Sequence, residues 1–220
     1  MNVYEAIAAR RTIRDFDSRP IDREILLRVL DAGMKAPTNN HLRQWHFIRV
    51  ESRGRRETLA RFFFTERTEE EVREVIDSWD MDVGSQYDMY LDAIPKQASM
   101  VIGAAELLIP CFRQESDLLG AKQGLHELNG FASMWAVIEN ILIAAASEGI
   151  FGVTKIISAP EERDHIRSTL GIPDEFEVPC YLPLGYPAAE AVHHPQIPVN
   201  AADRLYVDRW VGLESTFAES

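Results

Sequence analysis

The residues best suited to chemistry form a basic motif near the N-terminus, Arg10-Arg11-Thr12-Ile13-Arg14. The chain of 220 residues carries a formal net charge of -12, so a local group of cations is better explained by an anion site than by the general surface. Residues 3–7 precede the motif with apolar side chains at helical spacing. At a helix end, guanidinium and backbone N–H groups can converge on a phosphate, although arginines there also simply complement the helix dipole.

A second polar motif lies between a predicted helix and a predicted strand. The helix is expected over residues 22–35, where apolar residues recur at three- and four-residue steps, and Pro37 ends it. An apolar strand is expected over residues 46–50. The loop between them contains the polar residues Thr38, Asn39, Asn40 and His41.

Together the two motifs resemble the nitroreductase family of FMN-dependent oxidoreductases. That family opens with Arg-Arg-Ser-x-Arg-x-Phe and Pro-Val/Ile, and later has a loop like Ala-Pro-Ser-x-x-Asn-x-Gln-Pro-Trp-x-Phe. The counterparts here are Arg10, Arg11, Thr12, Arg14, Phe16, Pro20, Ile21, Ala36, Pro37, Thr38, Trp45 and Phe47. His41, Arg43 and Gln44 replace the usual Asn, Gln and Pro, which affects substrate choice more than flavin binding.

The resemblance extends along the chain and implies a fold. Residues 131–150 are similar to the family's central helix, and Leu184-Gly185-Tyr186-Pro187 resembles its Gly-Tyr-Pro segment. The implied fold is α/β (α+β), with a mixed central sheet flanked by helices, in a single FMN-binding domain over residues 1–220. In this family the C-terminal tail, here residues 188–220 with Tyr206, Trp210, Val211, Leu213 and Phe217, wraps the partner of a homodimer.

The resemblance also implies roles for individual residues around FMN at the dimer interface. Arg14 would stabilise the negative charge of the reduced flavin near N1 and the C2 oxygen, and no covalent nucleophile is needed. Residues expected to hold the phosphate or ribityl chain are Arg10, Arg11, Thr12 and Arg204. Pro37, Thr38, Asn39 and Asn40 would contact the ring from the other protomer, and His41 is either a substrate contact or a hydrogen-bonded loop residue.

The implied activity is transfer of a hydride from NAD(P)H through FMN to a nitroaromatic, quinone or similar flat acceptor by a ping-pong mechanism. Two alternatives stay open. In the first alternative, the chain is a flavin-dependent dehalogenase or a flavin-fragmenting relative. In the second, it is an FMN-binding or sensing protein without efficient turnover.

Other sites and compartments are disfavoured by the composition. An acidic chain without an extended basic stripe does not suit nucleic acid, and neither a Gly-x-Gly-x-x-Gly nor a P-loop motif occurs. The pair His193-His194 lacks ligands at metal spacing, so no metal site is expected. Cys111 and Cys180 lie among apolar neighbours and are expected to be structural thiols of a cytoplasmic protein without a signal peptide.

The remaining predicted elements complete the expected sheet. Strands are expected over residues 100–112, 153–157 and 177–184, and a helix over residues 160–170, started by Ser158 and Pro160 and ended before Gly171. Residues 85–95, with Tyr87, Met89 and Tyr90, are expected to cover the flavin. Glu139 and Asn140 interrupt the apolar stretch 131–150, which favours a buried helix over a membrane span.

Overall fold

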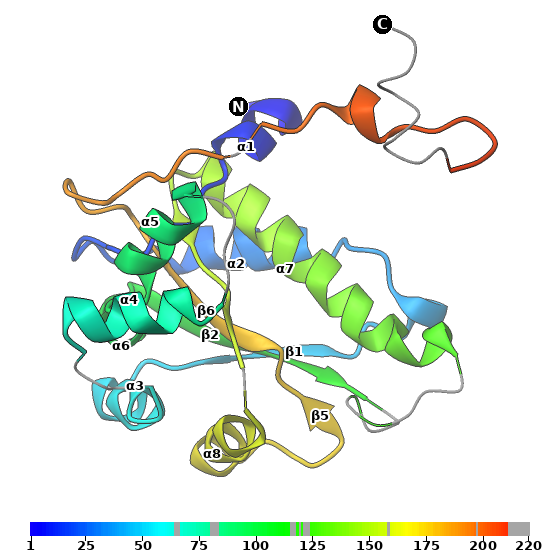
Figure 1. Cartoon of the computed structure of the whole chain (residues 1–220). Coiled ribbons are helices and arrows are strands. Elements are labelled where there is room, and N and C mark those ends of the chain that lie inside the picture. Colours follow the sequence, from blue (N-terminus) through cyan, green and yellow to red (C-terminus); the bar gives the residue numbers. More distant parts are fainter. Residues whose placement is uncertain are drawn as a thin grey trace, which may run out of the picture.

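The computed structural model describes residues 1–63, 67–79, 84–114, 118, 120, 124–157, 159–196 and 198–210. Its α-helices are α1 (Val3–Ala9), α2 (Arg23–Gly33), α3 (Arg53–Ala60), α4 (Glu69–Asp77), α5 (Gly84–Ala93), α6 (Gln97–Gly103), α7 (Asn129–Ser147) and α8 (Pro160–Leu170). Short 3-10 turns are η1 (Asn39–His41), η2 (Leu125–Leu128) and η3 (Ala201–Arg204). Helices therefore lie on both sides of a central sheet (Figure 1).

The sheet is built on two long central strands. Its strands are β1 (Trp45–Arg49), β2 (Glu106–Arg113), β3 (Phe151–Gly152), β4 (Lys155–Ile156), β5 (Phe176–Glu177) and β6 (Cys180–Gly185). Their order is β1-β2-β6-β3, with β5 paired to β2 and β4 to β6, and all these ladders are antiparallel. An isolated parallel bridge between Thr12 and Gly152 adds the N-terminal segment. Among the described strands the sheet is therefore antiparallel, and the parallel pairing expected of a mixed sheet is limited to this bridge.

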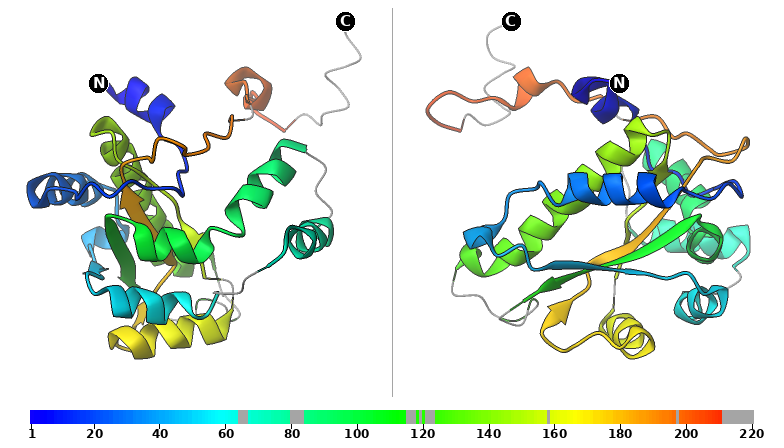
Figure 2. Two further views of the ribbon diagram at one scale, coloured as in Figure 1. Left: turned by 90° about the vertical axis from the view of Figure 1, so that its left-hand side faces the viewer. Right: turned by 180° about the vertical axis from the view of Figure 1, so that it is seen from behind.

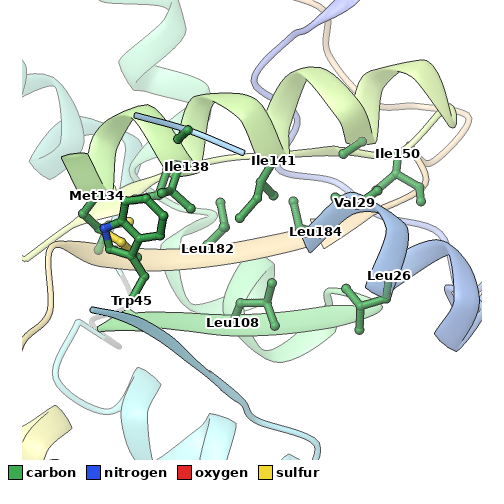
Figure 3. Close-up of a cluster of buried hydrophobic side chains, with 14 of the residues drawn as sticks. Leu26, Val29, Trp45, Leu108, Met134, Ile138, Ile141, Ile150, Leu182 and Leu184 are labelled. Atoms are coloured by element: carbon green, nitrogen blue, oxygen red, sulfur yellow. The ribbon is translucent and has the colours of Figure 1, made fainter. Parts of the chain in front are cut away.

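Each face of the sheet carries its own apolar core. On one face α2 and α7 cover β2 and β6. Figure 3 shows Ile138 and Ile141 of α7 above Leu182, with Leu26 and Val29 of α2 to the right. On the other face α3, α6 and α8 form a second core with Tyr181. Because both faces are covered, β2 and β6 are apolar along nearly their whole length instead of alternating with polar residues.

The two cysteines confirm the prediction of buried structural thiols. Cys111 on β2 belongs to the core under α3, α6 and α8, whereas Cys180 on β6 belongs to the core under α2 and α7. Both thiols are free, and burial raises the pKa of Cys111 to about 12. A thiol in this setting is held in its unreactive protonated form.

The predicted strand over residues 100–112 is wrong in its first half. Residues Gln97–Gly103 form α6, and the chain turns at Ala104 before β2 begins. A short apolar run does not distinguish a buried helix from a buried strand by its pattern. The buried guanidinium of Arg56 stabilises the turn, because it donates hydrogen bonds to the carbonyls of Val50, Ile102 and Ala104.

The other elements are close to the prediction. Helix α8 covers residues 160–170, with Gly171 just past its end, while Ser158, the expected start signal, lies outside the described residues. Within the expected strand 153–157 only β4 forms, and β3 lies just before that range. The strand expected over 177–184 is divided into β5 and β6.

Helix α7 is the core helix that the sequence predicted over residues 131–150. The stretch Leu125–Ser147 is long and apolar enough to cross a membrane, with a mean hydropathy of 1.4. In the fold it packs along α2 and the sheet, and six of its residues are buried. Other apolar residues of the helix, among them Phe131, Trp135 and Leu142, are half-buried and pack against the same core.

The tail after Pro187 runs past α1 and away from the sheet (Figure 2). Tyr206 and Trp210 contact each other, with ring centroids 4.5 Å apart. The indole of Trp210 is exposed. Val211, Leu213 and Phe217, the other apolar tail residues singled out in the sequence, lie outside the described residues.

Gly152 should be essential to the close contact between β3 and β6. A Cβ atom there would lie 2.5 Å from the carbonyl oxygen of Pro183, which is backbone and cannot swing aside. Gly152→Ala is expected to lower the free energy of unfolding by about 1–3 kcal/mol in urea titrations. Gly103→Ala is the control, since nothing lies within 4 Å of its added Cβ. Equal stability of both variants would contradict this account.

Candidate active site

The basic motif lies on an extended segment that follows α1. Ile13 is fully buried, and its N–H donates to the carbonyl of Gly152 at 3.2 Å. Further along, the N–H of Asp17 donates to the carbonyl of Tyr186 at 2.9 Å. Because side chains alternate along an extended chain, burying Ile13 leaves Thr12 and Arg14 on the other side.

Thr12 and Arg14 line a cavity of about 410 Å³. Arg10 and Arg11 share this wall with them. The rest of the wall comes from two distant parts of the chain, Gln86 and Met89 of α5 and residues 194–196 of the tail. Two of the residues expected to cover the flavin, Gln86 and Met89, therefore face the arginine motif.

Arg14 is the arginine of this cavity that has no direct partner among the described residues. No hydrogen bond or ion pair joins its half-buried guanidinium to any described residue. Burial lowers the pKa of Arg14 from its ordinary value, while the carboxylates of Asp92 and Asp15 act in the opposite direction. A desolvated guanidinium facing a cavity is a site for an anion or an electron-rich oxygen.

The other two arginines are held by the protein. Arg10 forms an ion pair with Glu139 of α7, at 3.5 Å. Arg11 donates from Nη1 to the backbone carbonyls of Ala8 and Arg10, at 2.6 and 2.8 Å. These contacts orient both side chains at the end of α1.

A charge cluster connects the arginine segment to α5 and to the tail. Lys96 donates to Asp15 at 2.5 Å and also to Asp92, and the imidazole Nε2 of His194 lies 3.3 Å from Asp92. Burial alone would raise the pKa of Asp92, but the hydrogen bonds from Lys96 and His194 outweigh it and hold this pKa below its ordinary value. The carboxylates near Arg14 are thus bound to other cations.

The loop with Pro37 and Thr38 lines a different cavity. The cavity has a volume of about 430 Å³ and includes Thr38, Asn40 and Gln44 in its wall. Asn40, His41 and Arg43 all have positive φ angles, 48°, 54° and 45°, and such strain in residues with a Cβ is typical of functional loops. Within one chain, the two sequence motifs therefore line two separate cavities.

Three other expected site residues, Pro37, His41 and Arg204, line neither cavity. His41 is exposed and lines neither cavity. Arg204, in η3, is also exposed, and no described contact joins it to the arginine motif. The backbone of Asn39 lies in η1, while its side chain is outside the described part of the chain.

The sequence did not single out Gln86, and it assigned His194 to a surface or loop position. Neither residue belongs to a recognisable motif, so only the fold places them beside the arginines. The described residues contain no group of three or more His, Cys, Asp or Glu that could hold a metal ion.

Residues 7–186 match the family model described as the nitroreductase family. The chain belongs to the nitroreductase family. A relative from Methanothermobacter thermautotrophicus, provisionally named NADH dehydrogenase/NAD(P)H nitroreductase, is 26% identical over 213 residues, covering 96% of this chain and 88% of that protein. Membership of the nitroreductase family indicates an oxidoreductase.

Solved structures with the nitroreductase fold agree with the topology. The NADPH:FMN oxidoreductase of Vibrio harveyi complexed with NAD+ has a TM-score of 0.67 and 22% identity, over 97% of this chain and 80% of that one. An oxidised iodotyrosine deiodinase bound to FMN and 3-iodo-L-tyrosine has a TM-score of 0.66 and 19% identity, over 96% of this chain and 100% of that one. At these identities the likeness shows the fold alone.

The charge cluster should stabilise the fold in a pH-dependent way. The pKa of Asp92 lies below its ordinary value, so its contribution is present at neutral pH and is lost as the pH falls through that lowered pKa. Asp92→Asn is expected to cost about 1 kcal/mol at neutral pH and to flatten the loss of stability below about pH 4. Urea unfolding across this pH range measures both effects. Asp88→Asn, at an exposed position of the same helix, should behave like the wild type.

Proposed function

We propose that this protein is an FMN-dependent oxidoreductase that takes electrons from NAD(P)H and passes them to a nitroaromatic, quinone or similar flat acceptor. The observation that carries the proposal is the half-buried guanidinium of Arg14, which faces a cavity without a direct partner among the described residues. Bound FMN would supply the redox chemistry, and the protein would supply position and charge.

The arginine segment has a suitable arrangement for holding FMN. Arg14 would stabilise negative charge on the flavin ring, because a fixed cation in a partly desolvated site costs no reorganisation during the reaction. Arg10, Arg11 and Thr12 would bind the phosphate or ribityl chain at the end of α1. The names of related proteins support FMN as the cofactor and NAD(P)H as the electron donor, since they include an NADPH:FMN oxidoreductase and an NAD(P)H nitroreductase.

A homodimer would complete the site. The loop containing Pro37, Thr38, Asn39 and Asn40 lies at a separate cavity, so these residues would reach the flavin of the partner instead of their own chain's flavin. Helix α1 exposes the apolar side chains of Tyr4 and Ile7. Such surfaces favour association. In this arrangement residues 1–220 form one FMN-binding domain whose tail, with Arg204, extends onto the partner.

Removing the Arg14 guanidinium tests the proposed cofactor site. The wild-type protein is expected to bind FMN, seen as a flavin absorption spectrum that bleaches with anaerobic NADH or NADPH. Arg14→Ala is expected to weaken FMN affinity or slow flavin reduction by about tenfold or more, because a charge-assisted hydrogen bond is lost. Equilibrium dialysis and stopped-flow absorbance measure the two effects.

The control is Arg55→Ala, which removes an exposed arginine of α3 and should change neither quantity. A protein that stays colourless after FMN is added would contradict the proposed function. Product analysis with a nitroaromatic and with a halogenated phenol distinguishes nitroreduction from the alternative dehalogenation.

Charge on the exposed face of α1 should prevent the proposed dimer. Ile7 is 48% exposed, and Ile7→Glu would place a carboxylate in an apolar interface, where burying it is costly. Sedimentation velocity should give a dimer for the wild type and a monomer with lower FMN affinity for the variant. Ile156→Glu on β4, where the side chain is 51% exposed, is the matched control. A monomeric wild type would overturn the dimer.

A further inference from the structure

Trp45, the first residue of β1, carries a hydrogen-bond donor that has no partner among the described residues. Its side chain is 6% exposed and packs in the core with Phe112 and Met134. No hydrogen bond joins its indole Nε1 atom to a described residue. In the described part of the chain, the fully buried side-chain atoms without a partner are Nε of Arg163 and the hydroxyl of Tyr181, so Nε1 of Trp45 reaches the surface.

The surface that Nε1 reaches is the cavity of about 430 Å³ at the Thr38 loop, here called the Thr38 cavity. Trp45 lines this cavity together with Gly130 and Ser133, from the first turns of α7. Figure 3 shows the indole nitrogen turned toward Met134, at the same end of α7. Because the ring around it is packed in the core, the N–H of Trp45 is a fixed donor in the cavity wall.

A second donor lies in the same wall. Arg113, at the end of β2, is exposed, and its guanidinium has no ion pair or hydrogen bond with a described residue. Its backbone is held, since the N–H of Arg113 donates to the carbonyl of Gln44 at 3.1 Å. The carboxylate of Glu127 also lines the cavity, where it accepts a hydrogen bond from the N–H of Gly124 at 3.3 Å. The groups that remain for a ligand therefore include two donors, the indole N–H and the guanidinium.

The apolar part of the wall suits a flat ring. Leu42, Trp45 and Phe112 line the Thr38 cavity beside the two donors. A cavity of roughly 150 Å³ holds benzene, so the Thr38 cavity has room for a substituted aromatic ring. In the proposed homodimer the Thr38 loop reaches the partner's flavin, and a ring bound in this cavity would lie next to that flavin.

We propose that the Thr38 cavity binds the electron acceptor and that Trp45 determines its specificity, by donating a hydrogen bond from Nε1 to an oxygen of a nitro or quinone group. This inference rests on the proposed function and adds to it the acceptor's binding site. Arg113 would contact the same group. Reduction places negative charge on those oxygens, which fixed donors stabilise. A carbon–halogen group is a weak hydrogen-bond acceptor, so the two donors favour nitro compounds and quinones over halogenated phenols.

The test is a titration of the oxidised, FMN-loaded protein, labelled at its tryptophans and followed by NMR of the indole N–H signals. The chain has four tryptophans, so Trp79→Phe, Trp135→Phe and Trp210→Phe identify the remaining signal as that of Trp45. Nitrobenzene is the probe and toluene the control, because toluene keeps the ring and lacks the oxygens. Nitrobenzene is expected to shift the Trp45 indole proton downfield, as a new hydrogen bond does, and toluene is not.

Two variants measure the contribution of each donor. Trp45→Phe keeps an aromatic ring and removes the N–H, and it is expected to reduce the preference for nitrobenzene over toluene about fivefold in binding titrations. Arg113→Met keeps the length of the side chain, leaves the core untouched and is expected to reduce the same preference about threefold. If Trp45 acted only through packing, its variant would weaken both probes equally and nitrobenzene would leave the wild-type indole proton unmoved.

Trp79→Phe is the matched control, because its side chain is 48% exposed and lies outside the Thr38 cavity. It should bind both probes like the wild type, and its kcat/KM for nitrobenzene should be unchanged, whereas Trp45→Phe should lower kcat/KM about fivefold.

The outcomes separate this inference from the proposed function. A wild-type flavoprotein that reduces nitrobenzene while its Trp45 signal stays unmoved would overturn the inference and leave the proposed function standing. A Trp45→Phe variant that keeps the full preference for nitrobenzene would do the same. Failure of the wild type to bind FMN would overturn both.

Discussion

The candidate site depends on the close packing of the N-terminal segment against the sheet. Ile13 is fully buried, and its N–H donates a hydrogen bond to the carbonyl of Gly152. Phe16 packs so closely on Gly185 that a Cβ there would lie 2.7 Å from the ring. These two contacts fix the backbone on both sides of Arg14. A guanidinium on a long flexible side chain is thereby presented from a rigid backbone.

The charges around the arginine segment are not all paired with each other. The acidic side chains near Arg14 are paired with other residues, which leaves the Arg14 guanidinium at the cavity. The chain is strongly acidic, yet the carboxylates closest to Arg14 are occupied by Lys96 and His194. Lys96 lies between α5 and α6, so the same contacts that neutralise Asp15 and Asp92 also attach α5 to the cavity. The same set of ion pairs therefore stabilises α5 and leaves Arg14 available to a ligand.

The sequence predicted the parts of this protein that depend on local patterns. Arg10 to Arg14 and the loop at Pro37 are contiguous motifs, and both line cavities, although their predicted contacts with FMN stay predictions. The apolar run over residues 97–103 was misassigned because burial on both sides removes the periodic signal. His194 was missed for another reason. Its place beside the arginine cavity depends on Asp92, a residue 102 positions away, and no local pattern records such a pair.

The arginine motif and the loop at Thr38 line separate cavities of one chain, which favours the proposed homodimer. The arginine segment lies at the end of α7 that contacts α1, and the loop at Thr38 lies near its opposite end, beside η2. A helix of 19 residues is about 28 Å long, so the same chain cannot bring both motifs to one flavin. An antiparallel pairing of two α7 helices would place each end of one beside the opposite end of the other. In the proposed homodimer, two-fold symmetry would then combine each arginine cavity with the Thr38 loop of the partner.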